Sequence, residues 1–70
     1  METFALKEEY IQLDQLLKAC KIVSSGGVAH QFVDDGLVKV NKFVEKRRRA
    51  KIRVGDIVEV SGKIITIVKE

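Results

Sequence analysis

The sequence predicts an α+β fold in which two short helices pack on a small antiparallel sheet. Up to about residue 36, the chain contains two segments whose apolar residues recur at the three- and four-residue spacing of a helix face. From Leu37 onward apolar residues alternate with polar ones, which is the period of a strand with one solvated face. Because these strands follow one another through short turns, we expect them to pair antiparallel.

The length of 70 residues fits one small domain, residues 1–70, and leaves no room for a deep substrate cavity. Hydrophobic residues make up 46% of the chain and charged residues 33%, which is typical of a globular protein. No apolar run reaches the roughly 18 residues of a membrane span, so we expect no membrane contact. Cys20 is the only cysteine, which excludes an internal disulfide and suits a cytoplasmic protein.

The first helix is predicted from about residue 12 to residue 20. Its apolar stripe follows the spacing i, i+3, i+4, i+7 and consists of Leu13, Leu16, Leu17 and Cys20. We expect Asp14 on the opposite, exposed face, where a carboxylate in the first turn suits the helix dipole. Before this helix, residues 3–6 are predicted as a short edge strand and residues 8–12 as a connection.

The second helix is predicted from about residue 27 to residue 35. Ser25 is its candidate N-cap, and Gly36 is placed to end it in the left-handed conformation. Its buried stripe is expected to contain four residues, namely Val28, Ala29, Phe32 and Val33. Asp34 and Asp35 stand near its C-terminal end, where negative charge is unfavourable with the helix dipole, and the sequence offers no structural reason for them.

Three or four strands and their turns are predicted after residue 36. The first covers residues 37–41, and a tight turn at Asn41 and Lys42 leads into the second at residues 43–44. A turn at Gly55 and Asp56 precedes the third strand, at residues 57–60. A hairpin over residues 61–63 then joins it to the fourth strand, at residues 64–68.

The positive charge is concentrated in one segment. The formal net charge of the chain is +3, which is a weak indication of a polyanionic partner. Residues 39–53 contain eight lysines and arginines and one glutamate, a net charge of +7. Residues 1–38 sum to −3 and residues 54–70 to −1. Contact with a polyanion is therefore expected at residues 39–53.

Several short strings occur together at set distances along the middle of the chain: Leu13-Asp14, Leu17, Ser25, Ala29, Gly36-Leu37-Val38-Lys39-Val40-Asn41 and Gly55-Asp56 with Val58. This combination, over about residues 12–60, resembles the S-four-type RNA-binding domain, also called the alpha-L motif, in its short stand-alone bacterial form. The resemblance implies a helix pair and adjoining strands that bind structured RNA, such as ribosomal or transfer RNA, in a basic groove. The chain departs from the usual Arg, Gly, Arg and Gly of the family at four positions: Gln12, Lys21, Gly26 and Lys42.

The arginine run is the first candidate site. A guanidinium group matches phosphate oxygens with two parallel hydrogen bonds, so consecutive arginines favour phosphate contact. The alternative is an ordinary solvated basic surface. The candidate RNA-binding residues of this segment are Lys46, Arg47, Arg48, Arg49 and Lys51.

The start of the second helix is another candidate site. Free N–H groups and the positive end of the helix dipole attract an anion there, and glycines let a phosphate approach closely. An ordinary helix cap is the alternative. The candidates are Ser25, Gly26 and Gly27, with His30 expected nearby on the exposed side of the helix. The groove implied by the resemblance adds Lys21, Lys39, Asn41 and Lys42.

No combination of residues indicates catalysis. Cys20 completes an apolar stripe and has no evident activating partner, and the carboxylates are scattered along the chain. We therefore expect a monomeric protein that is not an enzyme and has no cofactor, metal ion or small-molecule substrate. Two functions remain open. One is binding of structured RNA in ribosome assembly or translation, and the other is docking, as a protein-interaction module, on a ribosome-associated or replication partner.

Overall fold

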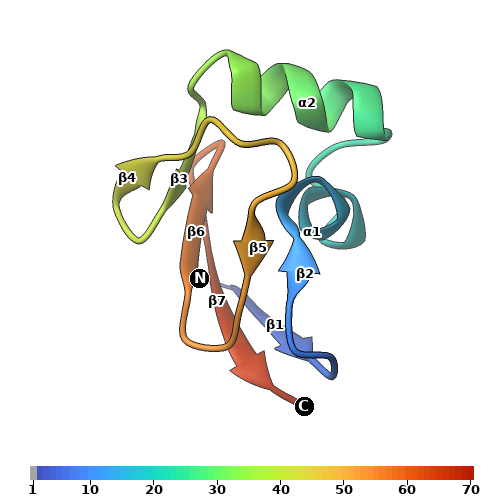
Figure 1. The fold of residues 1–70 in the computed structure, drawn as a ribbon. Helices are drawn as coiled ribbons and strands as arrows, with labels where there is room; N and C mark the ends of the chain where they lie inside the picture. Colours follow the sequence, from blue (N-terminus) through green and yellow to red (C-terminus); the bar gives the residue numbers. More distant parts are fainter. Residues whose placement is uncertain (1) are drawn as a thin grey trace.

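The computed structural model describes residues 2–70 and has an α+β fold (Figure 1). Its elements are β1 (Glu2–Leu6), β2 (Ile11–Gln12), α1 (Leu13–Ala19), α2 (Gly26–Asp34), β3 (Val38–Val40), β4 (Phe43–Val44), β5 (Lys51–Ile52), β6 (Ile57–Val60) and β7 (Lys63–Lys69). The predicted α+β class and both predicted helices are confirmed. The first helix is one residue shorter at each end than predicted, and the second begins and ends one residue earlier.

The main sheet has five strands in the order β1-β7-β6-β3-β4. Three of its pairs, β3 with β4, β3 with β6 and β6 with β7, are antiparallel. Two of them, β3 with β4 and β6 with β7, join consecutive strands through short turns as predicted, whereas the pair of β3 with β6 was not predicted. The fourth pair is parallel, because β1 runs alongside β7 with Glu2 opposite Ile65 and Leu6 opposite Lys69. The sheet is therefore mixed, which corrects the prediction of a wholly antiparallel sheet. Short turns impose antiparallel pairing only on strands that they join directly, and β1 and β7 are separated by most of the chain.

A second, two-stranded sheet lies beside the first helix (Figure 1). β2 and β5 pair antiparallel, with Ile11 opposite Ile52 and Gln12 opposite Lys51. Residues 8–12 were predicted as a connection, and its last two residues instead form β2. Two-residue strands are too short to produce a visible alternation in the sequence. Their pairing brings the end of the basic segment next to the start of α1.

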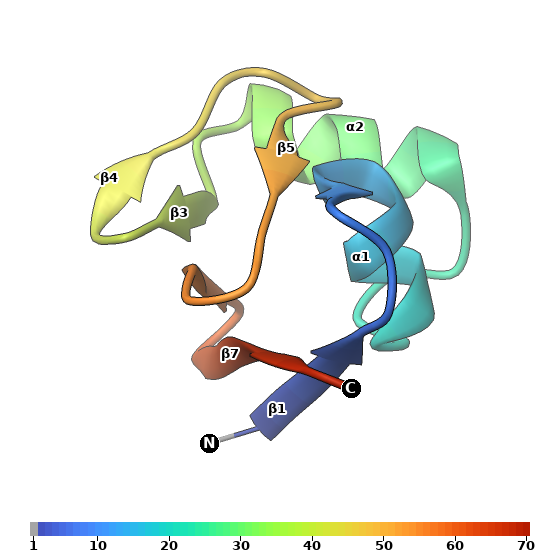
Figure 2. The ribbon, with the colours of Figure 1, turned by 60° about the horizontal axis from the view of Figure 1, so that its bottom comes forward.

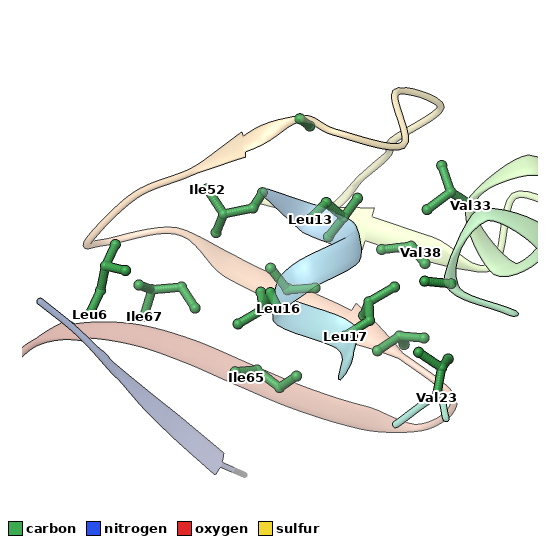
Figure 3. Close-up of a cluster of buried hydrophobic side chains, with 14 residues drawn as sticks. Leu6, Leu13, Leu16, Leu17, Val23, Val33, Val38, Ile52, Ile65 and Ile67 are labelled. Atoms are coloured by element: carbon green, nitrogen blue, oxygen red, sulfur yellow. The ribbon is translucent and has the colours of Figure 1, made fainter. Parts of the chain in front are cut away.

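The hydrophobic core fills the space between the helices and the main sheet (Figure 3). Leu13, Leu16 and Leu17 of α1 are completely buried, which confirms the predicted stripe. Figure 3 shows them in the middle of the cluster, near Ile65 of β7 and Val33 of α2. Full burial of a leucine side chain stabilises the fold by about 1.5–3 kcal/mol relative to leaving it exposed. The leucines of α1 are therefore a main source of stability for the whole domain.

The apolar stripe of α2 is narrower than predicted. Ala29 and Val33 are fully buried and Phe32 packs partly buried against the core, but Val28 is 39% exposed. Val28 belongs to the first turn of the helix and lines an open surface beside the end of α1. The prediction that Val28 is buried is therefore wrong.

Both helices end with the same backbone arrangement. In α1 the N–H of Lys21 bonds to Lys18 O and that of Ile22 to Leu17 O, which are the two hydrogen bonds of a Schellman motif. In α2 the corresponding donors are Gly36 and Leu37. The residue that reverses the chain has a φ of 59° at Lys21 and 74° at Gly36. Lys21 thus occupies a left-handed position that favours glycine.

The two hairpin turns of the main sheet are as predicted. Asn41 and Lys42 have φ values of 52° and 74°, and Ser61 and Gly62 have values of 53° and 76°. Positive φ at both central residues is the geometry of a type I′ turn, whose twist matches that of the flanking strands. Among residues 2–70, no helix is both long and apolar enough to cross a membrane.

Candidate nucleic-acid interface

The segment that we call the arginine loop, residues 45–50, joins β4 to β5 and runs along α2 to the start of α1 (Figure 2). Its backbone is hydrogen-bonded to the start of α1: Leu13 N donates to Ala50 O at 2.9 Å and Asp14 N to Arg48 O at 3.1 Å. The N-cap residue Gln12 makes no side-chain cap of its own. The loop carbonyls therefore satisfy N–H groups that the helix leaves open, and this fixes the loop in place.

Each of the three consecutive arginines lies near a carboxylate. Arg47 donates two hydrogen bonds to Glu45, at 3.0 and 3.1 Å. Arg48 donates two to Asp34 of α2, at 3.0 and 2.6 Å. Arg49 Nε lies 4.0 Å from an oxygen of Asp14. These contacts offset the mutual repulsion of the arginines and provide the structural reason for Asp34 that the sequence did not offer.

The ion pairs leave the guanidinium groups available to a ligand. The side chains of Arg47, Arg48 and Arg49 remain 79%, 52% and 73% exposed. The hydrogen bonds from Arg48 hold the pKa of Asp34 below its ordinary value, and those from Arg47 lower the pKa of Glu45. Each guanidinium has five N–H donors, so two bonds to a carboxylate leave three for phosphate oxygens.

His30 and Asp14 connect the two helices on the side where the arginine loop passes. Their side chains form a hydrogen bond of 3.0 Å, in which His30 Nε2 donates because a carboxylate only accepts. Asp14 is buried, with 7% exposure, and the His30 side chain is 27% exposed. The predictions of an exposed Asp14 and of an outward-facing His30 are therefore both wrong. The helical stripe rule placed Asp14 opposite the leucines and did not consider a second helix on that side.

The start of α2 has the predicted cap. Ser25 Oγ accepts a hydrogen bond from Val28 N at 3.3 Å, and nothing lies within 4 Å of the position that a Cβ of Gly26 would occupy. Beside it, a concave surface is lined by residues from the end of α1 and the start of α2: Lys18, Lys21, Ile22, Val23, Ser24 and Val28. The structure thus places Lys21 next to the predicted Ser25–Gly27 site.

Four cations gather around one concave surface, which we call the cationic pocket. It is lined by Arg47, Arg49, Ala50, Lys51 and Arg53. On the β2–β5 sheet, Lys51 Nζ lies 5.0 Å from the centre of the Tyr10 ring, a cation–π contact. Arg53 was not among the predicted site residues. The signal for it was its place two residues after Lys51, since alternate residues of an extended segment share a face.

The remaining predicted residues are not all brought to this pocket. Lys39 lies on the face of β3 that also carries Glu59 and Ile64, opposite to the buried Val38. Asn41 uses its side chain within the fold, since it donates to Asp56 Oδ1 and accepts from Ile57 N. Asp56 also accepts from Arg53 N at 2.8 Å, which confirms its predicted role as a turn residue.

Lys46 lies over the end of α2, and Lys42 is exposed at the tip of the β3–β4 turn. Lys46 Nζ donates to Asp34 O, a carbonyl in the last turn of the helix, at 3.4 Å. Asp35 accepts two hydrogen bonds from Gln31 one helical turn earlier.

Burial raises the pKa of the Cys20 thiol, which keeps it in the unreactive protonated form. Among residues 2–70, no group of three histidine, cysteine or acidic side chains could hold a metal ion.

Comparison with known proteins assigns the fold to a family. Residues 4–68 match the model of the S4 domain. The chain is 40% identical over 58 residues to the "Probable ribosome maturation protein RlbA" of Bacillus subtilis, covering 83% of this chain and 82% of RlbA. It is 38% identical over 69 residues to YbcJ of Escherichia coli, covering 97% and 99% of the two chains.

A solved structure agrees with the sequence match. The solution structure of YbcJ from E. coli, described as revealing an alfaL motif involved in RNA-binding, superposes with a TM-score of 0.74. The superposition covers 97% of this chain and 87% of the YbcJ chain, and the two sequences are 38% identical. The matched region includes both helices and the arginine loop. The protein therefore belongs to the S4 domain family and has the alpha-L fold.

Proposed function

We propose that the protein binds structured RNA without catalysing a reaction on it, and that the cationic pocket holds the RNA backbone. The observation that carries the proposal is the convergence of Arg47, Arg49, Lys51 and Arg53 on one concave surface. The name of RlbA and the RNA-binding motif described for YbcJ support an RNA ligand. They also favour an RNA of the translation machinery, which the protein would meet in the cytoplasm as a monomer.

Binding would depend mainly on phosphate contacts. The planar guanidinium group of arginine donates two parallel hydrogen bonds to phosphate oxygens. The arginine loop is held against α1 by two backbone hydrogen bonds. A fixed loop loses little conformational entropy when it binds, so its charges contribute more to affinity. The concave surface beside Lys21 and Ser25 would contact a neighbouring part of the RNA backbone. Recognition would follow the shape of a folded RNA more than its sequence.

A salt series of binding measurements tests the proposal. The ligands are a structured ribosomal RNA fragment, transfer RNA and a duplex DNA of matched length. If four phosphates are engaged, log K should fall against log salt with a slope of about −3 to −4. Replacing Arg47 and Arg49 together by alanine should make the slope shallower by about 1.5 and weaken binding to all RNAs.

The matched control removes the same charge from another part of the molecule. Lys63→Ala with Lys69→Ala changes two cations of β7, outside the pocket, and should leave the slope close to that of the wild type. Weak binding of RNA and DNA alike, unchanged by the Arg47 and Arg49 variant, would overturn the proposal. That result would favour docking on a protein partner.

A further inference from the structure

Phe43 is the most exposed of the large hydrophobic side chains among residues 2–70, at 78%. It is the first residue of β4, directly after the Asn41–Lys42 turn, and it pairs with Val40 of β3. β4 is the edge strand of the main sheet, so no further strand covers this side. Val40 packs against the core, whereas the Phe43 ring extends beyond it. The fold therefore gains little from an aromatic side chain at this position.

Cations lie close to Phe43 along the chain. Lys42, its neighbour in the turn, is exposed and held in the left-handed conformation, with a φ of 74°. The arginine loop begins two residues after Phe43, and Arg47 of the cationic pocket follows two residues later. Four residues of extended chain span at most roughly 14 Å, so the ring and the pocket lie within reach of one short stretch of RNA.

An exposed aromatic ring beside cations fits a nucleotide better than a protein surface. Bases stack on aromatic side chains while cations neutralise the adjoining phosphates. Protein interfaces are enriched in phenylalanine and arginine but depleted in lysine, so the lysine beside the ring and the excess of positive charge, rather than the ring itself, favour a nucleotide. Inside a continuous duplex, each base is already covered by its neighbours. A ring at the tip of a β-hairpin is therefore best placed to stack on a base that is unpaired and not already stacked, as in a bulge or an open loop.

We infer that Phe43 is a stacking platform for an unpaired base of the RNA whose backbone lies in the cationic pocket. The inference rests on the proposed function and adds a feature to the ligand: a folded RNA with an accessible unpaired base next to its helix. Because every base has an aromatic face, the platform requires an unpaired base but does not specify which one.

A fluorescent variant tests the contact directly. The chain contains no tryptophan, so Phe43→Trp introduces a single indole at the site. The two probes are an RNA hairpin with one unpaired adenine in its stem and the same hairpin without it. Both are closed by the same compact four-base loop whose bases stack on one another, so the probes differ only in the accessible unpaired adenine. We expect the bulged hairpin to quench the indole fluorescence and the regular hairpin to bind with little quenching. Equal quenching by both hairpins, or quenching by neither, would overturn the inference.

Affinity measurements separate stacking from simple apolar contact. Phe43→Leu keeps apolar bulk but removes the ring, and should weaken binding of the bulged hairpin by about 5- to 150-fold while changing binding of the regular hairpin much less. Phe43→Tyr should stay close to the wild type. Ile64→Ala, at another partly exposed apolar position, is the control and should change neither affinity. Full affinity of the Phe43→Leu variant for the bulged hairpin would exclude stacking.

The outcome also shows which proposal fails. If the wild type binds the bulged hairpin, the Arg47 and Arg49 variant binds weakly and the Phe43 variants bind normally, then RNA binding stands and only the stacking platform is wrong. If the wild type binds neither hairpin nor any structured RNA, both proposals fail together.

Discussion

The two helices are similar in length but are held in different ways. α1 buries three leucines completely, and its first N–H groups bond to carbonyls of the arginine loop. α2 buries only Ala29 and Val33 and is capped by the side chain of Ser25. Its other attachments are polar and lie near the surface, as in the ion pair of Asp34 with Arg48.

The difference indicates a division of roles. Apolar burial fixes α1, so changes there should alter the stability of the whole domain. Fewer buried atoms and several polar contacts hold α2, so changes there should have smaller effects that depend more on pH and salt. The following four predictions test this comparison, from the largest expected effect to the smallest.

The leucines of α1 should be the most sensitive positions. Leu17→Ala should lower the free energy of unfolding by about 2–5 kcal/mol, because it removes buried methyl groups and leaves a cavity. Val33→Ala in α2 removes a smaller side chain and should cost roughly half as much. Urea denaturation of both variants provides the measurement. Equal losses at the two positions would mean that the helices contribute alike to the core.

The two helix ends should respond in opposite directions to glycine changes. Gly36→Ala places a Cβ on a residue with a φ of 74° and should destabilise the protein by about 1–2 kcal/mol. Lys21→Gly relieves the same strain at the end of α1 and should stabilise it by about 1 kcal/mol. Thermal unfolding would detect both shifts. Lys21→Ala is the control, since it removes the charge but keeps the strain, and should not stabilise the protein.

The two helix starts should differ in their dependence on side chains. Ser25→Ala removes the cap of α2 and should cost about 1 kcal/mol. Gln12→Ala should have almost no effect, because the first N–H groups of α1 bond to backbone carbonyls of residues 48 and 50. Chemical denaturation compares the two variants. A large loss from Gln12→Ala would show that the arginine loop is not the effective cap.

The ion pairs of the arginine loop should give a small, acid-sensitive contribution. The pKa values of Asp34 and Glu45 are lowered by hydrogen bonds from Arg48 and Arg47, so both carboxylates release their protons more readily in the folded state. Their stabilisation is present above the ordinary values of 3.8 and 4.5 and is lost as the pH falls through the lower folded values.

Asp34→Asn isolates one of these pairs. Stability measured from pH 7 to pH 3 should fall less steeply for this variant than for the wild type. The difference should shrink in high salt, because both partners are exposed to solvent. Parallel curves for the two proteins would show that the pair with Arg48 adds nothing to stability.

Most of the fold could be predicted because its signals are local. The spacing of Leu13, Leu16 and Leu17 and the alternation after Leu37 gave the elements, and short turns gave two of the four pairs in the main sheet, β3 with β4 and β6 with β7. The pairing of β3 with β6 joins strands that are not consecutive and was not predicted. The parallel pairing of β1 with β7 has no local signal. The β2–β5 pair was missed because two residues cannot show a period.

The site could be predicted in composition but less well in arrangement. The arginine run and the Ser25 cap were visible as residue types. The burial of Asp14 against His30 depends on how α1 packs against α2. The apolar stripe of one helix does not predict that packing. Lys39 was grouped with the helix cations through the groove that the family resemblance implies, but it lies on the face of β3 opposite to the buried Val38, beside Glu59.

The parallel pairing of β1 with β7 has a consequence for the order of folding during synthesis. Glu2 lies opposite Ile65, so β1 has no partner in the sheet until almost the whole domain has been made. Contacts over such a long sequence separation close slowly, whereas the helices and hairpins form from neighbouring residues. We therefore expect β1 to pair with β7 last during synthesis, after the helices and hairpins have formed.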